Sequence, residues 1–201
     1  MAIIIKQVST KKELKKFIQF NKELYKGNAY SVPDLYDDML NTFNKHKNPA
    51  FEFCDAEYFL AYKDDKLVGR VAAIINHKAN KTWNKKDVRF GWIDFIDDPE
   101  VSEALLKAVE KYGKEHGMEN ILGPLGFTDF DAEGMLIEGF DQLSTMATIY
   151  NYPYYPEHMQ KLGYEKDADW VEFQIYIPES GVPEKHQRIS DIIQKKYNLR
   201  V

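Results

Sequence analysis

A tyrosine-rich stretch, residues 148–156, holds the densest group of side chains that could bind a ligand. Tyrosine presents a flat apolar ring with a polar tip, a combination that suits ligand and partner pockets. Asn151 could bind a polar ligand group through both its amide donor and its carbonyl acceptor. The alternative is that Pro153, Pro156 and the tyrosines form a rigid, packed loop.

A longer glycine-rich segment, residues 126–155, overlaps this stretch and shows neither helical nor strand periodicity. Loops of this length inside a domain are often functional. Three acids in the segment, Glu133, Glu138 and Asp141, could recognise a cationic amine, or they could be scattered surface acids.

Other familiar chemistries have little support in the sequence. None of the five histidines is four residues from another, so no metal site is expected. The single cysteine, Cys54, has no sequence-local base, which favours inert packing. The chain lacks both a phosphate-loop motif and a nucleophile elbow, so nucleotide hydrolysis and serine hydrolase chemistry are not indicated.

The 201 residues are 44% hydrophobic, enough to build a full core. A net charge of −5 argues against a dedicated nucleic-acid partner. No apolar run approaches the roughly 18 residues of a membrane helix, so no membrane partner is expected. With one cysteine and no secretory signal, the sequence indicates a cytoplasmic protein.

Helical spacing, alternation and turn residues predict a mixed α/β order of elements. Thr10 and Glu13 have the spacing of a capping box, Asp64–Asp65 that of a hairpin turn, and Pro99 that of a helix start. Strands are predicted at 3–8, 58–62, 67–75, 88–96, 120–124 and 169–177, and helices at 10–26, 33–43, 99–116, 155–163 and 184–197.

Three stretches resemble the GNAT superfamily of acyl-CoA N-acyltransferases. They are the hairpin EYFLAYKDDKLVGRVAAIIN, the strand–helix–strand GWIDFIDDPEVSEALLKAVEKYGKEHGMENILGP, and the helix–strand YYPEHMQKLGYEKDADWVEFQIYI. Residues 123–141 and 146–166 more narrowly resemble a subgroup of bacterial GNAT-like proteins of unassigned function, whose members are about double this length. The resemblance covers most of the chain and is more specific for fold than for substrate.

The resemblance implies an α/β (α+β) fold with a central mixed sheet of about six strands flanked by helices. Its fourth and fifth strands, here 88–96 and 120–124, would splay apart to hold a thioester. Residues 1–178 would form the GNAT-like domain, and residues 179–201 a linker helix and the start of a second domain.

The resemblance to the GNAT superfamily also implies transfer of an acyl group from acetyl-CoA, or another acyl-CoA, to a small-molecule amine. Asp94 on the fourth strand would be the general base. Backbone amides near Ile96 and Ile121 would polarise the carbonyl, and the acyl group would lie beside Gly123. In the superfamily a tyrosine often serves as the general acid, and Met159 occupies its position here. Tyr154 or Tyr155 would therefore take that role. Asn151 would line the pocket.

Two alternatives come from the residues themselves. Alternation places Asp94 on the same face as Trp92 and Ile96, where burial would raise its pKa, but it could instead pair with Arg89 or Arg70.

The second alternative concerns the phosphate loop, where the superfamily has Arg or Gln followed by glycines. This chain has Asp97-Asp98-Pro99-Glu100, which would cap the helix without a ligand and repel a pyrophosphate. The chain could therefore be a non-catalytic module that binds a small ligand, or that packs against a second copy or a second GNAT-like domain.

Overall fold

The computed structural model describes residues 2–145, 149–176 and 178–200. Thr148 and Ile177, each at the end of a stretch singled out in the sequence, lie outside the described residues. The chain divides into two units between Lys166 and Asp167. No described helix is long and apolar enough to cross a membrane.

The first unit is built on one sheet with the strand order β1-β2-β3-β4-β5. Neighbouring strands are antiparallel except β4 and β5, which are parallel. The hairpin turn between β2 and β3 falls at Asp64 and Asp65, whose positive φ values of 50° and 62° suit a two-residue turn. The strands are β1 (Ile4–Gln7), β2 (Cys54–Lys63), β3 (Lys66–Asn76), β4 (Asp87–Phe95) and β5 (Asn120–Leu122).

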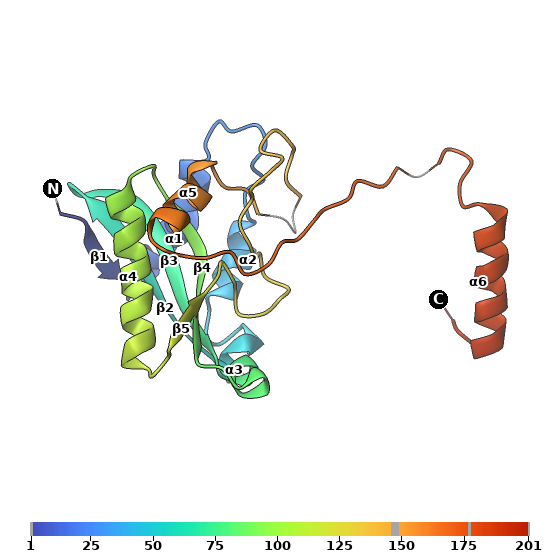
Figure 1. Cartoon of the computed structure of the whole chain (residues 1–201), viewed down its shortest axis with the longest axis horizontal. Coiled ribbons are helices and arrows are strands. Elements are labelled where there is room, and N and C mark those ends of the chain that lie inside the picture. The colour runs from blue at the N-terminus through green and yellow to red at the C-terminus, as the bar shows by residue number, and fades with distance from the viewer. Residues whose placement is uncertain (1, 146–148, 177, 201) are drawn as a thin grey trace. The chain divides into compact units, whose positions relative to one another are not determined.

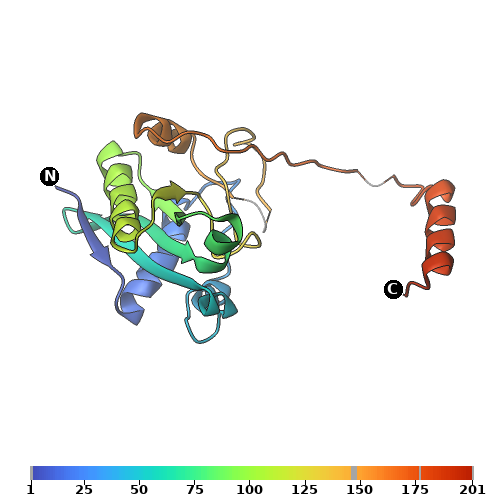
Figure 2. The ribbon, with the colours of Figure 1, turned by 60° about the horizontal axis from the view of Figure 1, so that its bottom comes forward.

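Helices cover both faces of the sheet (Figures 1 and 2). Phe17 and Ile18 of α1 belong to one core cluster, whereas Val101 and Leu105 of α4 belong to another, on the opposite face. The capping box predicted at Thr10 and the proline start predicted for α4 are both present. The helices of this unit are α1 (Lys11–Leu24), α2 (Tyr36–Thr42), η1 (Pro49–Glu52), α3 (His77–Trp83), α4 (Pro99–Glu115) and α5 (Tyr154–Lys161).

A β-bulge interrupts β4 at Trp92, which has a positive φ of 43°. Arg70 lies opposite Asp94 but Ala72 lies opposite Gly91, so β4 carries one extra residue between these pairs. The extra residue reverses the alternation of side chains beyond it. The cluster on the α4 face consequently takes side chains from both sides of the bulge: Val88, Phe90, Ile93 and Phe95.

The strands β4 and β5 pair over only three residues, the last pair being Arg89 with Leu122. A further backbone hydrogen bond, from Leu125 N to Phe90 O at 2.9 Å, joins the two segments just past the end of β5. β4 then continues to Phe95 without a strand beside it on that edge. The divergence expected between these two strands is therefore present.

The second unit consists of residues 167–176 and 178–183 without helix or strand, followed by α6 (Glu184–Tyr197). The predicted sixth strand is wrong for its described part, because residues 169–176 pair with no other strand. An alternating sequence forms a strand only where another strand pairs with it. The apolar side chains of this segment are exposed, namely Trp170, Val171, Phe173, Ile175 and Tyr176.

Candidate active site where β4 and β5 diverge

Asp94 lies near the end of β4 and is almost completely buried, with 4% of its surface exposed. Its carboxylate pairs with the equally buried Arg70 of β3, whose Nη2 and Nε lie 2.7 Å and 2.8 Å from Oδ2. Of the two arginines considered from the sequence, Arg70 is the partner. Arg89 instead donates to the carbonyl oxygens of Gly126 and Phe127.

The remaining hydrogen-bonding positions of Asp94 are also occupied. Asn21 of α1 donates to Oδ2 at 3.1 Å, and the hydroxyls of Tyr25 and Tyr155 lie 3.2 Å and 3.3 Å from Oδ1. The apolar environment expected for Asp94 is therefore wrong, because charged and polar donors surround it. Ile96, expected on the same face, packs against the cluster on the opposite face.

Two tyrosines of α5 occupy the free edge of β4. Phe95 N donates to the Tyr155 hydroxyl at 3.1 Å, and the Tyr154 hydroxyl donates to Phe95 O at 2.6 Å. The Tyr155 ring also stacks on Phe95, with ring centroids 4.2 Å apart. The sequence-predicted residues Asp94, Tyr154 and Tyr155 thus meet at the end of β4, where β5 is absent.

The hydroxyls at this site hold their protons firmly. Burial, and then the nearby Asp94 carboxylate, raises the pKa of Tyr25 and of Tyr155 above the usual range. Burial, and then Asp97, raises the pKa of Tyr154. At neutral pH these hydroxyls are therefore protonated, so they can donate hydrogen bonds but cannot act as bases.

A row of tyrosine rings extends the site toward α1. Tyr152 stacks on Tyr154 with centroids 5.6 Å apart, and Tyr25 lies 4.9 Å from Tyr152. Tyr150 meets Tyr25 edge to face at 5.7 Å and receives a hydrogen bond from Asn28. The tyrosine-rich stretch therefore packs against the end of α1 and contributes to the site as well.

A Ser–His–Asp arrangement beside the site was not anticipated from the sequence. The His158 Nδ1 lies 2.9 Å from the buried Ser102 Oγ, and its Nε2 lies 3.0 Å from Asp97 Oδ1. These residues come from α5, α4 and the β4–α4 loop, and no sequence spacing links them. Because Ser102 is fully buried and also donates toward Pro99 O, the arrangement anchors α5 to α4.

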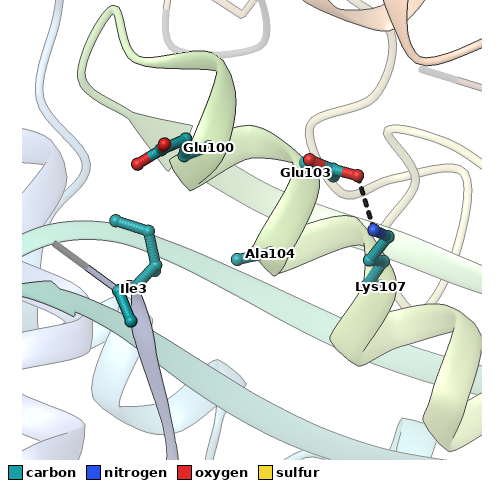
Figure 3. A pocket seen from close by; sticks show the side chains of 6 residues that line it. Ile3, Glu100, Glu103, Ala104 and Lys107 are labelled. Carbon is teal, nitrogen blue, oxygen red and sulfur yellow. Dashed lines mark hydrogen bonds and ion pairs between the residues drawn. The ribbon is translucent and has the colours of Figure 1, made fainter.

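Two hollows of the surface lie away from these residues. One of about 440 Å³ is bounded by Ile3 and the first turns of α4 (Figure 3), and another of about 750 Å³ lies between α4 and strands β1 and β2. Neither is lined by Asp94, Tyr154 or Tyr155. Among the described residues, no three histidine, cysteine or acidic side chains are placed to hold a metal ion.

Relatives in sequence are distant and longer than this chain. No family model matches it. Protein YghO of Escherichia coli is 30% identical over 98% of this chain and 50% of its own length. The bacterial ceramide synthase of Caulobacter vibrioides is 28% identical over 90% of this chain and 47% of its own length. The chain thus spans about half the length of these curated relatives.

Solved structures share the arrangement of strands and helices. The aminoglycoside acetyltransferase AAC(6')-Iy, bound to a bisubstrate analog, matches with a TM-score of 0.53 and 15% identity over 88% of this chain and 99% of its own. A predicted acetyltransferase of Clostridium acetobutylicum with acetyl-CoA matches with a TM-score of 0.50 and 11% identity over 86% of this chain and 96% of its own. The chain has the GNAT fold.

Both of these solved structures hold CoA or a CoA derivative, as their names record. In this chain the start of α4 does not fit a pyrophosphate. Asp98 caps the helix by accepting from Glu100 N at 3.0 Å, and Lys63 lies 2.6 Å from Asp98 Oδ2. The hydrogen bond from Lys63 holds the pKa of Asp98 below its usual value. As the sequence indicated, acids and Pro99 occupy the place of free amides.

The other predicted GNAT site residues are placed as follows. Ile96 N donates to Val68 O at 3.1 Å, so this amide is already bonded within the sheet. Ile121 pairs with Val88 inside the parallel ladder. Gly123 packs so tightly on β4 that a Cβ there would lie 2.3 Å from Phe90 O.

Asn151 is buried and bonds to the loop backbone, accepting from Leu136 N at 2.6 Å and donating to Leu136 O at 3.1 Å. Its amide donor and acceptor thus organise the glycine-rich loop. Of the three loop acids, burial raises the pKa of Glu133.

Proposed function

We propose that this chain is an N-acyltransferase domain that forms an amide between an acyl thioester and a long-chain amine. The observation that carries the proposal is the meeting of Asp94, Tyr25, Tyr154 and Tyr155 at the point where β4 loses its neighbour β5. The GNAT fold supports the reaction type. The ceramide synthase relative supports the acceptor, because a ceramide is an acylated long-chain amine.

In the proposed reaction the amine nitrogen attacks the thioester carbonyl carbon and the carbon–sulfur bond breaks. The proton lost by nitrogen ends on the sulfur of the released thiol. Tyr154 is the proposed proton relay: its half-buried hydroxyl, protonated at neutral pH, gives its proton to the leaving sulfur and takes up the proton that the nitrogen loses.

Asp94 and Tyr155 take different roles from Tyr154. Both are buried and hydrogen-bonded to each other. We assign them to positioning: Asp94 fixes the Tyr155 hydroxyl, and Tyr155 fixes Phe95 and the start of α5. The base role expected for Asp94 would require a proton to pass through these hydroxyls.

The donor is assigned only as a thioester. The capped start of α4 offers no site for the nucleotide of CoA, so the proposal routes no step through that part of the molecule.

The test is thiol release from acetyl-CoA or palmitoyl-CoA in the presence of a long-chain amino alcohol, with mass spectrometry of the amide. Tyr154→Phe should slow turnover about 100-fold. Tyr150→Phe is the matched control, because within the described part of the chain its hydroxyl bonds Phe140 O and Asn28 rather than β4 or Asp94. Absence of thiol release above the enzyme-free rate with both donors would overturn the proposal.

A second candidate function is the non-catalytic module. It is favoured by the internal bonding of Phe95 N, Phe95 O and the start of α4, because backbone groups that already have partners are less available to a ligand. Binding of CoA without transfer would support this candidate. A ligand at about 100 times its Kd should add roughly 2.7 kcal/mol to the free energy of unfolding, which thermal unfolding can detect.

A further inference from the structure

Most residues on the exposed face of α1 are lysines. Phe17, Ile18 and Phe20 are buried, which fixes the opposite side of the helix toward solvent. Seven positions of the helix are exposed. Five of them are the lysines Lys11, Lys12, Lys15, Lys16 and Lys22, and the other two are Gln19 and Glu23.

These lysines differ from those of α4, which also lie on an exposed helix face. Each exposed lysine of α4 pairs with a glutamate four residues away, as Figure 3 shows for Lys107 and Glu103. Among the described residues, no lysine of α1 forms an ion pair. The charge of the α1 face is therefore not neutralised from within the first unit.

The neighbouring strands add to this face. Lys6 of β1 and Lys16 of α1 both lie over the ring of Tyr62, at 5.0 Å and 5.6 Å from its centroid. Two ammonium groups thus converge on one ring. An anion bound here would relieve the repulsion between them.

The overall charge of the chain conceals this asymmetry. Residues 1–26 contain seven lysines and only two acids, a net charge of +5, although the whole chain carries −5. The remaining residues therefore carry −10. A separation of charge of this size indicates an anionic partner for the basic face.

We propose that the lysine face of α1, with Lys6, docks this domain on an anionic lipid surface. Clusters of basic residues bind anionic leaflets, and the energy falls off within a Debye length. The inference rests on the proposed function, because a long-chain amine resides in a bilayer and the domain must reach it there. No membrane partner was expected because no apolar run could span a bilayer, but docking on a bilayer surface needs no such run.

The helix α6 favours lipid over other anionic partners. Its exposed apolar residues Ile189, Ile192 and Ile193 share the helix with four basic side chains, Lys185, Arg188, Lys195 and Lys196. An apolar stripe bordered by basic residues suits the bilayer interface, where the chains can be buried. A nucleic acid would use the charges but leave the isoleucines in water.

The test is flotation of the full chain with vesicles of phosphatidylcholine alone or with 30% phosphatidylglycerol, at low and at high salt. The experiment needs no turnover, so it fails or succeeds separately from the transferase assay. Binding should require phosphatidylglycerol, weaken with salt, and fall at least tenfold in the triple variant Lys11→Gln, Lys12→Gln, Lys15→Gln. The matched control changes three paired lysines of α4, Lys107, Lys111 and Lys114, to Gln and should bind like wild type.

Three outcomes would overturn the proposal. They are no binding to the anionic vesicles at low salt, an equal loss in the two triple variants, or tighter binding to a short DNA duplex than to the vesicles. Thermal unfolding midpoints within a few degrees of wild type establish that the variants are folded. Both sets of substitutions replace exposed side chains with one of similar helix propensity.

Discussion

Arg70 and Asp94 face each other across β3 and β4 as a buried ion pair, with 2.7 Å between Nη2 and Oδ2. Arg70 also contacts α1, because its Nη1 donates to Phe17 O at 2.9 Å. The pair thereby links the end of β4 to the helix on that face of the sheet. Removing one partner would leave the other charged and unpaired inside the protein.

We predict that Asp94→Ala lowers the free energy of unfolding by about 3–5 kcal/mol, because it strands the Arg70 guanidinium. Urea denaturation followed by circular dichroism measures the change. Replacing both residues, Arg70→Met with Asp94→Leu, should cost less than Asp94→Ala alone. A loss smaller than 1 kcal/mol for Asp94→Ala would contradict the burial of the pair.

Stability should decline as the pH rises above about 10, the usual pKa of an unfolded tyrosine. Burial raises the pKa of Tyr25, Tyr58, Tyr154 and Tyr155 in the folded chain, so the folded state retains protons that the unfolded state releases. The stabilising contribution is fully present below pH 10 and is lost above it. Urea midpoints between pH 8 and pH 11.5, with absorbance at 295 nm, measure both effects.

The Tyr155 hydroxyl should contribute to the stability of the folded chain through its hydrogen bonds to Phe95 N and Asp94 Oδ1. Tyr155→Phe leaves Phe95 N and one position of Asp94 Oδ1 without this partner, at an expected cost of about 1–3 kcal/mol. Tyr150→Phe, at a half-buried site, should cost less. Equal unfolding free energies for the two variants would argue against the hydrogen bond to β4.

Gly91 is required by the close approach of the chain beyond β5. A Cβ at this position would lie 2.4 Å from Leu125 O, and backbone atoms cannot rotate away as a flexible side chain can. Gly91→Ala should therefore destabilise the protein by about 1–3 kcal/mol, as measured by denaturation. Unchanged stability would show that β4 and residues 123–125 are less tightly packed.

The cap of α4 should respond to substitution as an ordinary helix N-cap. Asp98→Ala removes the acceptor for Glu100 N and the partner of Lys63, so we expect a loss of about 1 kcal/mol in the free energy of unfolding. Asp98→Asn keeps the cap but not the charge and should restore most of the stability. If both variants lose the same amount, the ion pair contributes more than the cap.

Several elements were predictable because their signals are local. The capping box at Thr10 and Glu13, the turn at Asp64–Asp65 and the start of α4 at Pro99 each depend on residues a few positions apart. The helix α3 was missed because it is short, follows β3 directly and buries no residue that would give it an apolar periodicity. The sixth strand was predicted from a true alternation, but a strand needs a neighbour to pair with.

The site shows the same division. The sequence by itself determined which residue types were present, including Asp94 on a strand, the tyrosines of the 150–155 stretch, and acids where a phosphate loop would need amides. Only the tertiary structure decided that Arg70 pairs with Asp94, that Tyr25 shares its carboxylate, and that His158 joins Ser102 to Asp97. The physical reason is that these contacts join side chains from different elements, and their distances depend on how the sheet and helices pack rather than on sequence spacing.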